Sequence, residues 1–467
     1  MVRSRLVLVF VVLLVACAPR VESPLPPLED LNVLLICIDT LGAGHVGALA
    51  PEDEPGLDTT PNLDALARGG VLFTRAQAPA PWTQPSVGSL FTGLTPSHHG
   101  AIHLMDSLSD EHTTLAEWMK ARGKRTGGVI SHFLIDRELG YAQGFDRYDE
   151  TPIAGHRGVS SREVTDRAIA QLEAMAGDSF FLFVHYFDPH NVYVHHQDFS
   201  RSDWYDGPAR HWDPRINELR RRRHDMSPDD VRYFRDVYRE EVAFTDHHVG
   251  RLLDAVERAG LHDDTLVIVV ADHGESFMEQ GWIGHTRYLY DTFVHVPMIM
   301  SLPSHLPPDT VRAPVSLVDV PVTLLDLGGE DVGSGFDGDS LVPLLAGAPE
   351  SEWQRRPLFA EVSFLVDGDE RDPQVIEKEA FLTAVTREDW KLIHDLAAGS
   401  WELYDRSDDP YERDDLYDPE HRMVRELRPL LQEWEEGKTA TWGREFVDLD
   451  ALSPEQLERL RSLGYVD

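Results

Sequence analysis

Two acidic residues and a histidine stand where apolar runs of the sequence stop. Asp39 directly follows the run 33–38, and Asp272-His273 follows the run 266–270 after one alanine. Ligands of open α/β sheets gather beyond the carboxyl ends of the strands, so these side chains could hold one divalent cation. Oxygen and nitrogen donors suit Ca²⁺, Mg²⁺, Mn²⁺ or Zn²⁺ and do not decide among them. Taken singly, an aspartate at a strand end is more often a turn or cap residue.

A hydroxyl side chain provides a third candidate for chemistry. Thr83 precedes Pro85 and an apolar stretch over 87–91, a pattern typical of a helix start. Free N–H groups and the positive end of the helix dipole favour an anion there. A hydroxyl at this place, close to a metal, could act as an activated nucleophile. The alternative is an N-cap threonine without chemistry.

The elements that must position these residues alternate between strands and helices. Continuous apolar runs at 33–38, 180–184 and 266–270 predict strands buried on both faces, as in a parallel sheet. Thr60 as N-cap and Pro61 as first residue predict a helix that ends at Gly69-Gly70, and Ser227-Pro228-Asp229-Asp230 opens another. Residues 31–345 therefore read as one doubly wound α/β domain.

The pattern changes in the last quarter of the chain. Short strands are predicted close together at 358–363, 381–386, 390–395 and 401–404, followed by a terminal helix over 454–463. The acidic connection 367–378 reads as a surface loop. Residues 346–467 are thus expected to form a smaller α+β subdomain with an antiparallel sheet.

The N-terminus resembles an export signal. Arg3 and Arg5 precede an apolar run over 6–16, which is shorter than the about 20 residues that a spanning helix needs. The run ends Leu-Val-Ala-Cys, similar to a bacterial lipobox in which Cys17 becomes the lipidated N-terminus. An ordinary signal peptide is the alternative. With 1–17 as signal and 18–30 as a Pro-rich tether, we expect an exported protein anchored to a bacterial membrane by lipid alone, facing the periplasm or the cell surface. Cys37 is expected to be a buried, inert thiol.

Composition excludes several classes of protein. The chain has 467 residues, a formal charge of −38, 42% hydrophobic residues and two cysteines. The apolar content excludes a disordered chain, and the negative charge argues against a nucleic-acid partner. Two cysteines exclude a disulfide framework and a Cys-based zinc site.

Long segments of the sequence resemble the sulfatase family of the alkaline phosphatase superfamily. The resemblance runs from about residue 30 to 467 in the family's order, and its main segments are NVLLICIDTLGAGHVG, TPNLDALARGGVLFTRAQAPAPWTQPSVGSLFTGLTPSHHG, FLFVHYFDPH, DTLVIVVADHGESF and GWIGHTRYLYDTFVHVPMIM. The resemblance implies a large, mostly parallel sheet flanked by helices. It also implies a metal-dependent hydrolase of sulfuric or phosphoric esters, with an anionic small-molecule or glycan ester as substrate.

The resemblance also implies roles for single residues. Asp39, Asp272 and His273 match metal ligands, and Thr40 stands where many sulfatases place a second metal-binding Asp. Thr83 stands where they place the Cys or Ser that becomes formylglycine. The residues that hold the sulfate or protonate the leaving oxygen are matched by His190 and His285. Core or surface positions without a catalytic role are expected for His45, His98 and His99.

Departures from the family pattern affect the expected chemistry. Thr83 replaces the Cys or Ser of the signature and Val87 its Arg, while Gly42 and Gly44 replace Arg and Asp of a DTLRAD-like stretch. Threonine cannot give the formylglycine aldehyde, and threonine nucleophiles in this superfamily occur in phosphoryl transfer. The position therefore favours phosphate esters or diesters. One divalent ion is implied, Ca²⁺ by resemblance, with Mn²⁺ or Zn²⁺ possible given the threonine.

Two other functions compete with the hydrolase. A phosphoethanolamine or phosphoglycerol transferase would also use a threonine and one metal, but those enzymes carry several spanning helices. A binding protein on a decayed enzyme scaffold is favoured by the missing Cys and Arg and opposed by the metal-ligand pattern. The run 220–223, four consecutive arginines, could attract an anionic substrate, although a solvated helix or loop face is the more frequent explanation.

Overall fold

The computed structural model describes most of the chain. The described residues are 23–50, 57–153, 160–190, 192–366, 378–436, 438 and 452–463. The predicted signal segment with Cys17, the start of the tether, and 367–377 of the predicted surface loop lie outside them.

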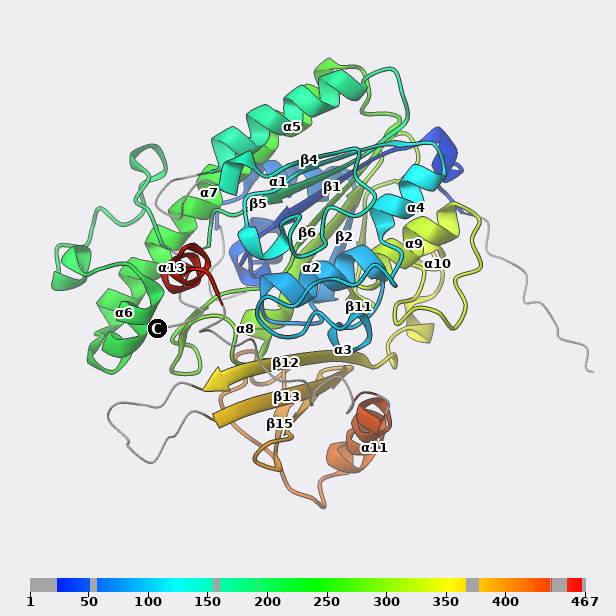
Figure 1. The fold of residues 1–467 in the computed structure, drawn as a ribbon. Coiled ribbons are helices and arrows are strands. Elements are labelled where there is room, and N and C mark those ends of the chain that lie inside the picture. The colour runs from blue at the N-terminus through cyan, green and yellow to red at the C-terminus, as the bar shows by residue number, and fades with distance from the viewer. Residues whose placement is uncertain are drawn as a thin grey trace, which may run out of the picture.

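A nine-stranded, mostly parallel sheet forms the centre of the protein (Figure 1). Its strand order is β10-β2-β9-β6-β1-β5-β3-β4, with β11 beside β2. Only β9 runs antiparallel to its neighbours β2 and β6. The strands are β1 (Asn32–Ile38), β2 (Val71–Gln77), β3 (Arg125–Val129), β4 (Arg147–Asp149), β5 (Phe180–Tyr186), β6 (Thr265–Ala271), β9 (His295–Ser301), β10 (Asp309–Val311) and β11 (Val315–Ser316).

The three apolar runs form adjacent strands in the middle of this sheet. Every residue of β1, β5 and β6 is buried, which confirms the prediction of strands covered on both faces. Helices supply that cover (Figure 1). On one side α1 (Pro61–Gly69), α5 (Ser161–Met175) and α7 (Pro228–Arg258) pack together, and on the other lie α2 (Thr83–Thr92), α4 (Leu115–Ala121), α9 (Asp319–Leu327) and α10 (Val342–Leu345).

The two predicted helix starts have different outcomes. Ser227 and Asp230 form the capping box of α7, in which the Ser227 hydroxyl accepts the Asp230 N–H at 3.2 Å. Thr60 precedes α1 as predicted, but its hydroxyl does not cap the helix. It accepts the N–H of Gly47 at 2.8 Å and donates to Asp64 at 3.1 Å. The predicted N-cap position of Thr60 and first-turn position of Pro61 are confirmed, but Thr60 makes no side-chain cap because a loop amide and a carboxylate take its hydroxyl.

A four-stranded antiparallel sheet follows, as predicted. Its order is β12-β13-β14-β15, and the first two strands extend beyond their predicted ends. Glu361 joins it to the large sheet by accepting the Ser97 N–H at 2.8 Å and donating its own N–H to Pro79 O at 3.0 Å. The elements are β12 (Leu358–Val366), β13 (Lys378–Arg387), β14 (Trp390–Asp395), β15 (Ser400–Asp405), α11 (Arg422–Glu436) and α13 (Pro454–Leu463).

Short elements complete the chain. The hairpin of β7 (Ser276–Phe277) and β8 (Ile283–Gly284) follows β6, and the short helices are α3 (Pro96–His99), α6 (Ile216–Arg222) and α8 (Asp291–Val294). Among the described residues, no helix is both long enough and apolar enough to cross a bilayer.

Candidate active site

The register of two central strands brings the predicted carboxylates together. β1 and β6 are parallel neighbours in which Ile38 is paired with Ala271, so Asp39 and Asp272 are the next residues of adjacent strands. Both are wholly buried, as is His273. The Nε2 atom of His273 lies 3.4 Å from Asp39 Oδ1 and 3.7 Å from Asp272 Oδ2. The structure thus unites the three residues that the sequence predicted to converge.

Several oxygens of this cluster have no hydrogen-bond partner. Both carboxylate oxygens of Asp39 and the Oδ2 of Asp272 lack one within the described chain. Leaving a buried carboxylate uncompensated costs several kcal/mol. The ligand atoms of Asp39, Asp272 and His273 all lie within 4.8 Å of one another. Two carboxylates and an imidazole in this arrangement fit a divalent cation.

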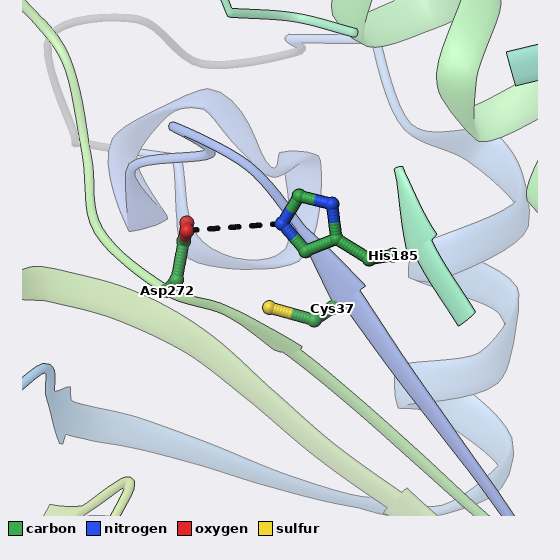
Figure 2. A group of neighbouring side chains, drawn as sticks. All are labelled: Cys37, His185 and Asp272. Atoms are coloured by element: carbon green, nitrogen blue, oxygen red, sulfur yellow. Dashed lines mark ion pairs between the residues drawn. The ribbon is translucent and has the colours of Figure 1, made fainter. Parts of the chain in front are cut away.

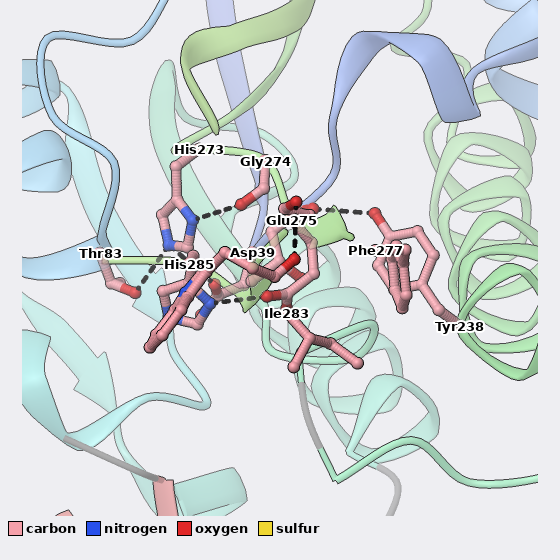
Figure 3. Close-up of polar contacts among 12 residues, drawn as sticks. Asp39, Thr83, Tyr238, His273, Gly274, Glu275, Phe277, Ile283 and His285 are labelled. Atoms are coloured by element: carbon pink, nitrogen blue, oxygen red, sulfur yellow. Dashed lines mark hydrogen bonds and ion pairs between the residues drawn. The ribbon is translucent and has the colours of Figure 1, made fainter. Parts of the chain in front are cut away.

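The orientation of His273 suits a metal ligand. Its Nδ1 lies 3.0 Å from the carbonyl oxygen of Gly274 (Figure 3). A carbonyl can only accept, so Nδ1 carries a proton, and Nε2 is the nitrogen that faces the carboxylates and could bind a cation once its own proton is displaced. Backbone geometry therefore fixes the ring for coordination.

Electrostatics in the cluster favour added positive charge. Burial, followed by the charge of Asp272, raises the pKa of Asp39 to about 7. Burial acts to lower the pKa of His273, but Asp272 and Asp39 outweigh it and raise that pKa to about 9. A bound cation would compete with these protons for the same atoms.

Thr83 lies beside the cluster. It is the first residue of α2 and is wholly buried, and its Oγ1 is 3.3 Å from His273 Nε2 (Figure 3). In the next turn of the chain the Ser86 hydroxyl donates to the carbonyl of Asp272 at 2.7 Å, which fastens the helix start to the end of β6. The predicted helix start is confirmed, and it presents the Thr83 hydroxyl to the cluster.

The two predicted substrate histidines also reach this place. The ring of His285 lies 4.5 Å from that of His273 and 4.8 Å from that of His190, centroid to centroid. Both residues are 2% exposed. Burial lowers the pKa of His285 well below its ordinary value, and the positive charges of His273 and Arg220 act in the same direction. His285 is therefore neutral at physiological pH.

Sequence reasoning missed two residues that hold His285. Glu275 Oε1 lies 3.1 Å from His285 Nδ1 (Figure 3), and Arg220 Nη2 donates to the His285 carbonyl at 3.1 Å. Arg220 also donates through Nε to Ile283 O at 3.3 Å. The interpretation of 220–223 as a solvated face is thus wrong for Arg220, although Arg221 and Arg222 are exposed. The signal for Glu275 was its place three residues after Asp272.

The remaining residues singled out in the sequence lie around the cluster or away from it. Thr40 has a positive φ of 57°, and its N–H donates to Asp272 Oδ1 at 3.3 Å. His45 packs edge-on against Tyr238 with centroids 4.8 Å apart. His98 pairs with Asp337, and His99 lies 3.2 Å from the Ser89 hydroxyl. None of these three histidines belongs to the buried group of Asp39, Asp272 and His273.

Comparisons with known proteins agree with this arrangement. The family model described as Sulfatase matches residues 31–330, and that described as N-sulphoglucosamine sulphohydrolase, C-terminal, matches residues 278–436. Choline-sulfatase of Rhizobium meliloti is 24% identical over 478 residues, which are 89% of this chain and 88% of the relative. The multifunctional alkaline phosphatase superfamily protein PehA of Trinickia caryophylli is 25% identical over 490 residues, 86% and 95% of the two chains.

A solved structure shows the same fold. Phosphonate monoester hydrolase of Agrobacterium radiobacter superposes with a TM-score of 0.70 at 22% identity, over 88% of this chain and 95% of the other. Further homologues act on sulfated sugars or glycans. The fold and the family match define an ester hydrolase of the alkaline phosphatase superfamily, which acts on sulfuric or phosphoric esters. Within it, the chain belongs to the sulfatase family, whose members typically bind a divalent metal.

Proposed function

We propose that this chain is a metal-dependent hydrolase that cleaves phosphate or sulfate esters with Thr83 as nucleophile. The observation that carries the proposal is the Thr83 hydroxyl, which begins a helix and lies 3.3 Å from His273 Nε2. Free N–H groups of the first helical turn favour the anionic group that the hydroxyl would attack. The nucleophile and an anion site therefore coincide.

Asp39, Asp272 and His273 would hold the cation. When bound, a divalent ion polarises the ester oxygens and lowers the pKa of a nearby hydroxyl. The residues themselves supply two negative charges and one imidazole lone pair in a site without water-exposed atoms. Their rigid anchoring at strand ends keeps that site preorganised.

His285 and His190 would act on the substrate. Because the pKa of His285 is held far below its ordinary value, its neutral ring favours hydrogen bonding to the ester oxygens over proton donation from an imidazolium. His190 is then the better candidate to protonate the leaving oxygen. Such general acid assistance contributes about 10²–10⁴-fold.

The threonine favours phosphorus over sulfur. In the first step the Thr83 hydroxyl gives up its proton and its oxygen bonds to the central atom, the ester bond breaks, and the leaving oxygen takes a proton. The resulting threonine ester has no aldehyde to re-form, so water must attack the central atom and release free threonine. Phosphoryl transfer resolves covalent intermediates by this in-line attack. Phosphate monoesters and diesters are therefore the preferred substrate class, and the substrate would be an anionic ester of a small molecule or a glycan.

A comparison of substrates tests this proposal. Wild type, Thr83→Ala and Thr83→Ser are assayed on aryl phosphate, aryl phosphodiester and aryl sulfate, with and without added Mn²⁺, Zn²⁺ or Ca²⁺. We expect wild type and Thr83→Ser to prefer a phosphorus ester, and Thr83→Ala to lose at least about 10³-fold in kcat, as nucleophile removal does elsewhere. Full turnover by Thr83→Ala would exclude the nucleophile, and activity on the sulfate alone would exclude the phosphorus preference.

The same assay separates hydrolase from binding protein. A decayed scaffold would show no turnover with any ester or metal, and its metal content after purification would be negligible. We expect instead about one bound divalent ion per chain and turnover that ceases on chelation. Release of free alcohol without transfer to added glycerol would distinguish hydrolysis from headgroup transfer.

We further propose that the protein is exported and lipid-anchored through Cys17. The support is the apolar run over 6–16 that ends Leu-Val-Ala-Cys and precedes a Pro-rich segment. In a bacterial host, the wild type should fractionate with membranes and Cys17→Ser with soluble protein or uncleaved precursor. Mass spectrometry of the mature N-terminus should find a diacylglyceryl cysteine, and an unmodified residue 17 would contradict the anchor.

A further inference from the structure

A further histidine lies at the metal cluster from inside the sheet. His185 is the one imidazole of β5, whose other residues are aromatic or aliphatic apart from the Tyr186 hydroxyl. It is wholly buried. In the parallel pairing of β1 and β5, His185 is aligned with Cys37. A continuous apolar run would ordinarily have a hydrophobic residue at this position, so the imidazole requires a reason.

Strand geometry explains where its side chain points. Alternate residues of a strand face the same side of the sheet. Cys37 and Asp39 therefore share a face of β1, and His185, aligned with Cys37, shares it on the neighbouring strand. On the other side of β1, Cys37 is aligned with Val270, two residues before Asp272. Figure 2 shows the His185 ring directed toward Asp272, with the Cys37 thiol below both.

The distances place His185 between the two carboxylates without a hydrogen bond to either. Its Nε2 is 3.8 Å from Asp39 Oδ2 and 3.9 Å from Asp272 Oδ2. Protein hydrogen bonds from nitrogen to oxygen measure about 2.7–3.2 Å, so both separations are too long. Neither ring nitrogen has a hydrogen-bond partner among the described residues. Buried polar atoms are rarely left in this state.

One cation accounts for all of these atoms. Ligands that lie about 2.0–2.2 Å from a tetrahedral zinc ion are about 3.3–3.6 Å from one another. Each imidazole Nε2 lies 3.4–3.9 Å from an oxygen of Asp39 and from Oδ2 of Asp272, with His273 facing Asp39 Oδ1 and His185 facing Asp39 Oδ2. An ion between the carboxylates would shorten the 3.9 Å separation between His185 Nε2 and Asp272 Oδ2. It would also satisfy the unpartnered oxygens of Asp39 and Asp272 and the His185 imidazole together.

We propose that His185 is a further ligand of the cation, through Nε2, beside Asp39, Asp272 and His273. This inference rests on the cation-binding role assigned in the proposed function. It changes the donor set from one nitrogen to two, with the carboxylate oxygens unchanged. Imidazole nitrogens suit Zn²⁺ and other transition metals, whereas Ca²⁺ prefers oxygen ligands alone. The site is therefore selective for a transition metal over Ca²⁺.

Metal titration of chosen variants tests the assignment. Wild type, His185→Ala, His185→Gln and Asp272→Asn are stripped with chelator and titrated with Zn²⁺ and separately with Ca²⁺ by calorimetry. We expect His185→Ala and His185→Gln to weaken Zn²⁺ binding more than the about 10–100-fold that follows loss of an outer-shell partner, with little change for Ca²⁺. Circular dichroism of each stripped variant verifies that it is folded, and the glutamine variant serves if the alanine variant is not.

Cys37→Ser is the matched control. The thiol, like His185, is grouped with Asp272 but not with Asp39 and His273, and it is equally buried. Its substitution disturbs the same packing without removing a proposed ligand. We expect Zn²⁺ affinity within about threefold of wild type. An equal loss in Cys37→Ser would overturn the inference, because packing and not the imidazole would then explain the effect.

X-ray absorption at the zinc edge gives an independent readout. The imidazole scattering should fit two rings in wild type and one in His185→Ala. Wild-type affinity in His185→Ala, combined with loss of Zn²⁺ in Asp272→Asn, would overturn the role of His185 and leave the cation site intact. Failure of the wild type itself to bind Zn²⁺ or Ca²⁺ would instead refute the cation in the proposed function.

Discussion

Two buried clusters of charge in this protein differ in how their charges are balanced. In the metal cluster, Asp39 and Asp272 form their ion pairs, within the described residues, only with His273 and His185. In the second, Lys391 is also wholly buried, and its Nζ lies 2.5 Å from Asp291 Oδ1 and 2.8 Å from Glu412 Oε1.

The second cluster is electrically complete. Arg406 Nη1 adds a bond of 2.7 Å to Asp291 Oδ2, so two cations face two anions. Asp291 begins α8 beside the large sheet, while Lys391 belongs to β14 of the small one. This cluster therefore joins the two sheets. The carboxylates of Asp39 and Asp272 form ion pairs only with imidazoles among the described residues, and three of their four oxygens have no hydrogen-bond partner there. Both clusters are buried, but only in the Lys391 cluster are the carboxylates paired with Lys and Arg side chains. This difference distinguishes a candidate cation-binding site from an ion-pair cluster that joins two sheets.

The largest expected effect is the loss of activity when Asp39 is replaced. Asp39→Asn removes a proposed cation ligand and should lower kcat/KM for an aryl ester by about 10³-fold or more, about 4 kcal/mol of transition-state stabilisation. The free energy of unfolding in chelator should not fall, because one of two like charges is gone. Steady-state kinetics and urea titration measure the two effects.

Asp319→Asn is a suitable control for Asp39→Asn. Asp319 is also wholly buried, but both of its oxygens pair with Arg356 at 2.6 Å. This variant should lose stability and keep the turnover of its folded fraction. The same activity loss in both variants would show that loss of any buried carboxylate, and not of a cation ligand, explains the effect.

Lys391→Met should mainly reduce stability. Breaking a buried ion pair by removing one partner costs about 3–5 kcal/mol, because the other charges stay buried. Here Asp291 and Glu412 would be left with Arg406 alone. Urea unfolding measures the free energy, and active-site titration normalises turnover to folded molecules. If the free energy of unfolding falls by less than about 1 kcal/mol, the Lys391 ion pairs do not stabilise the contact between the two sheets.

Stability of the metal-free protein should fall as pH rises. The pKa of Asp39 is raised to about 7 by burial and by Asp272, so the folded state binds this proton more tightly than the unfolded state. Stability then decreases from about pH 4 to pH 7, by about 1.4 kcal/mol per unit of pKa difference. His273, with its pKa raised to about 9, contributes stability below its unfolded pKa of about 6.5 that is lost as the pH passes 9.

Urea titrations in chelator at several pH values follow this slope. Asp39→Asn should reduce the dependence of the unfolding free energy on pH between pH 4 and 7. Saturating Zn²⁺ should oppose the fall in stability with rising pH, because metal binding displaces protons. An unchanged slope in Asp39→Asn would assign the titration to other groups.

The sequence alone predicted those residues of the site that directly follow a strand. Apolar runs locate parallel strands, and parallel strands place Asp39 and Asp272 at one edge, so their proximity follows from register. His185 escaped this reasoning because a strand buried on both faces has no alternation to mark its facing. Arg220 contacts His285 from α6 and Glu275 from the loop after β6, and no local pattern specifies where either element packs. No sequence pattern singled out Lys391 in the predicted strand 390–395, and only the packing of the two sheets shows that it is buried.

Glu275 is a further buried acidic residue, and it differs from both clusters because it is mostly protonated. Its substitution should have the smallest effect on activity of the variants considered. Burial raises its pKa to about 8, so near neutral pH it is mostly uncharged and serves as a hydrogen-bond partner of His285 at 3.1 Å. Glu275→Gln keeps that partner and should retain kcat/KM within about threefold. Glu275→Ala should lower it about 10–100-fold, as loss of an orienting partner does around catalytic groups.

The split between kcat and KM shows how Glu275 acts. If it only orients His285 toward the ester oxygens, Glu275→Ala should reduce kcat more than it raises KM, while Zn²⁺ affinity measured by calorimetry stays unchanged. A loss of Zn²⁺ binding in Glu275→Ala would make this carboxyl part of the metal cluster. In that case the cluster would have a third carboxyl, and the charge imbalance that distinguishes it from the Lys391 cluster would be larger.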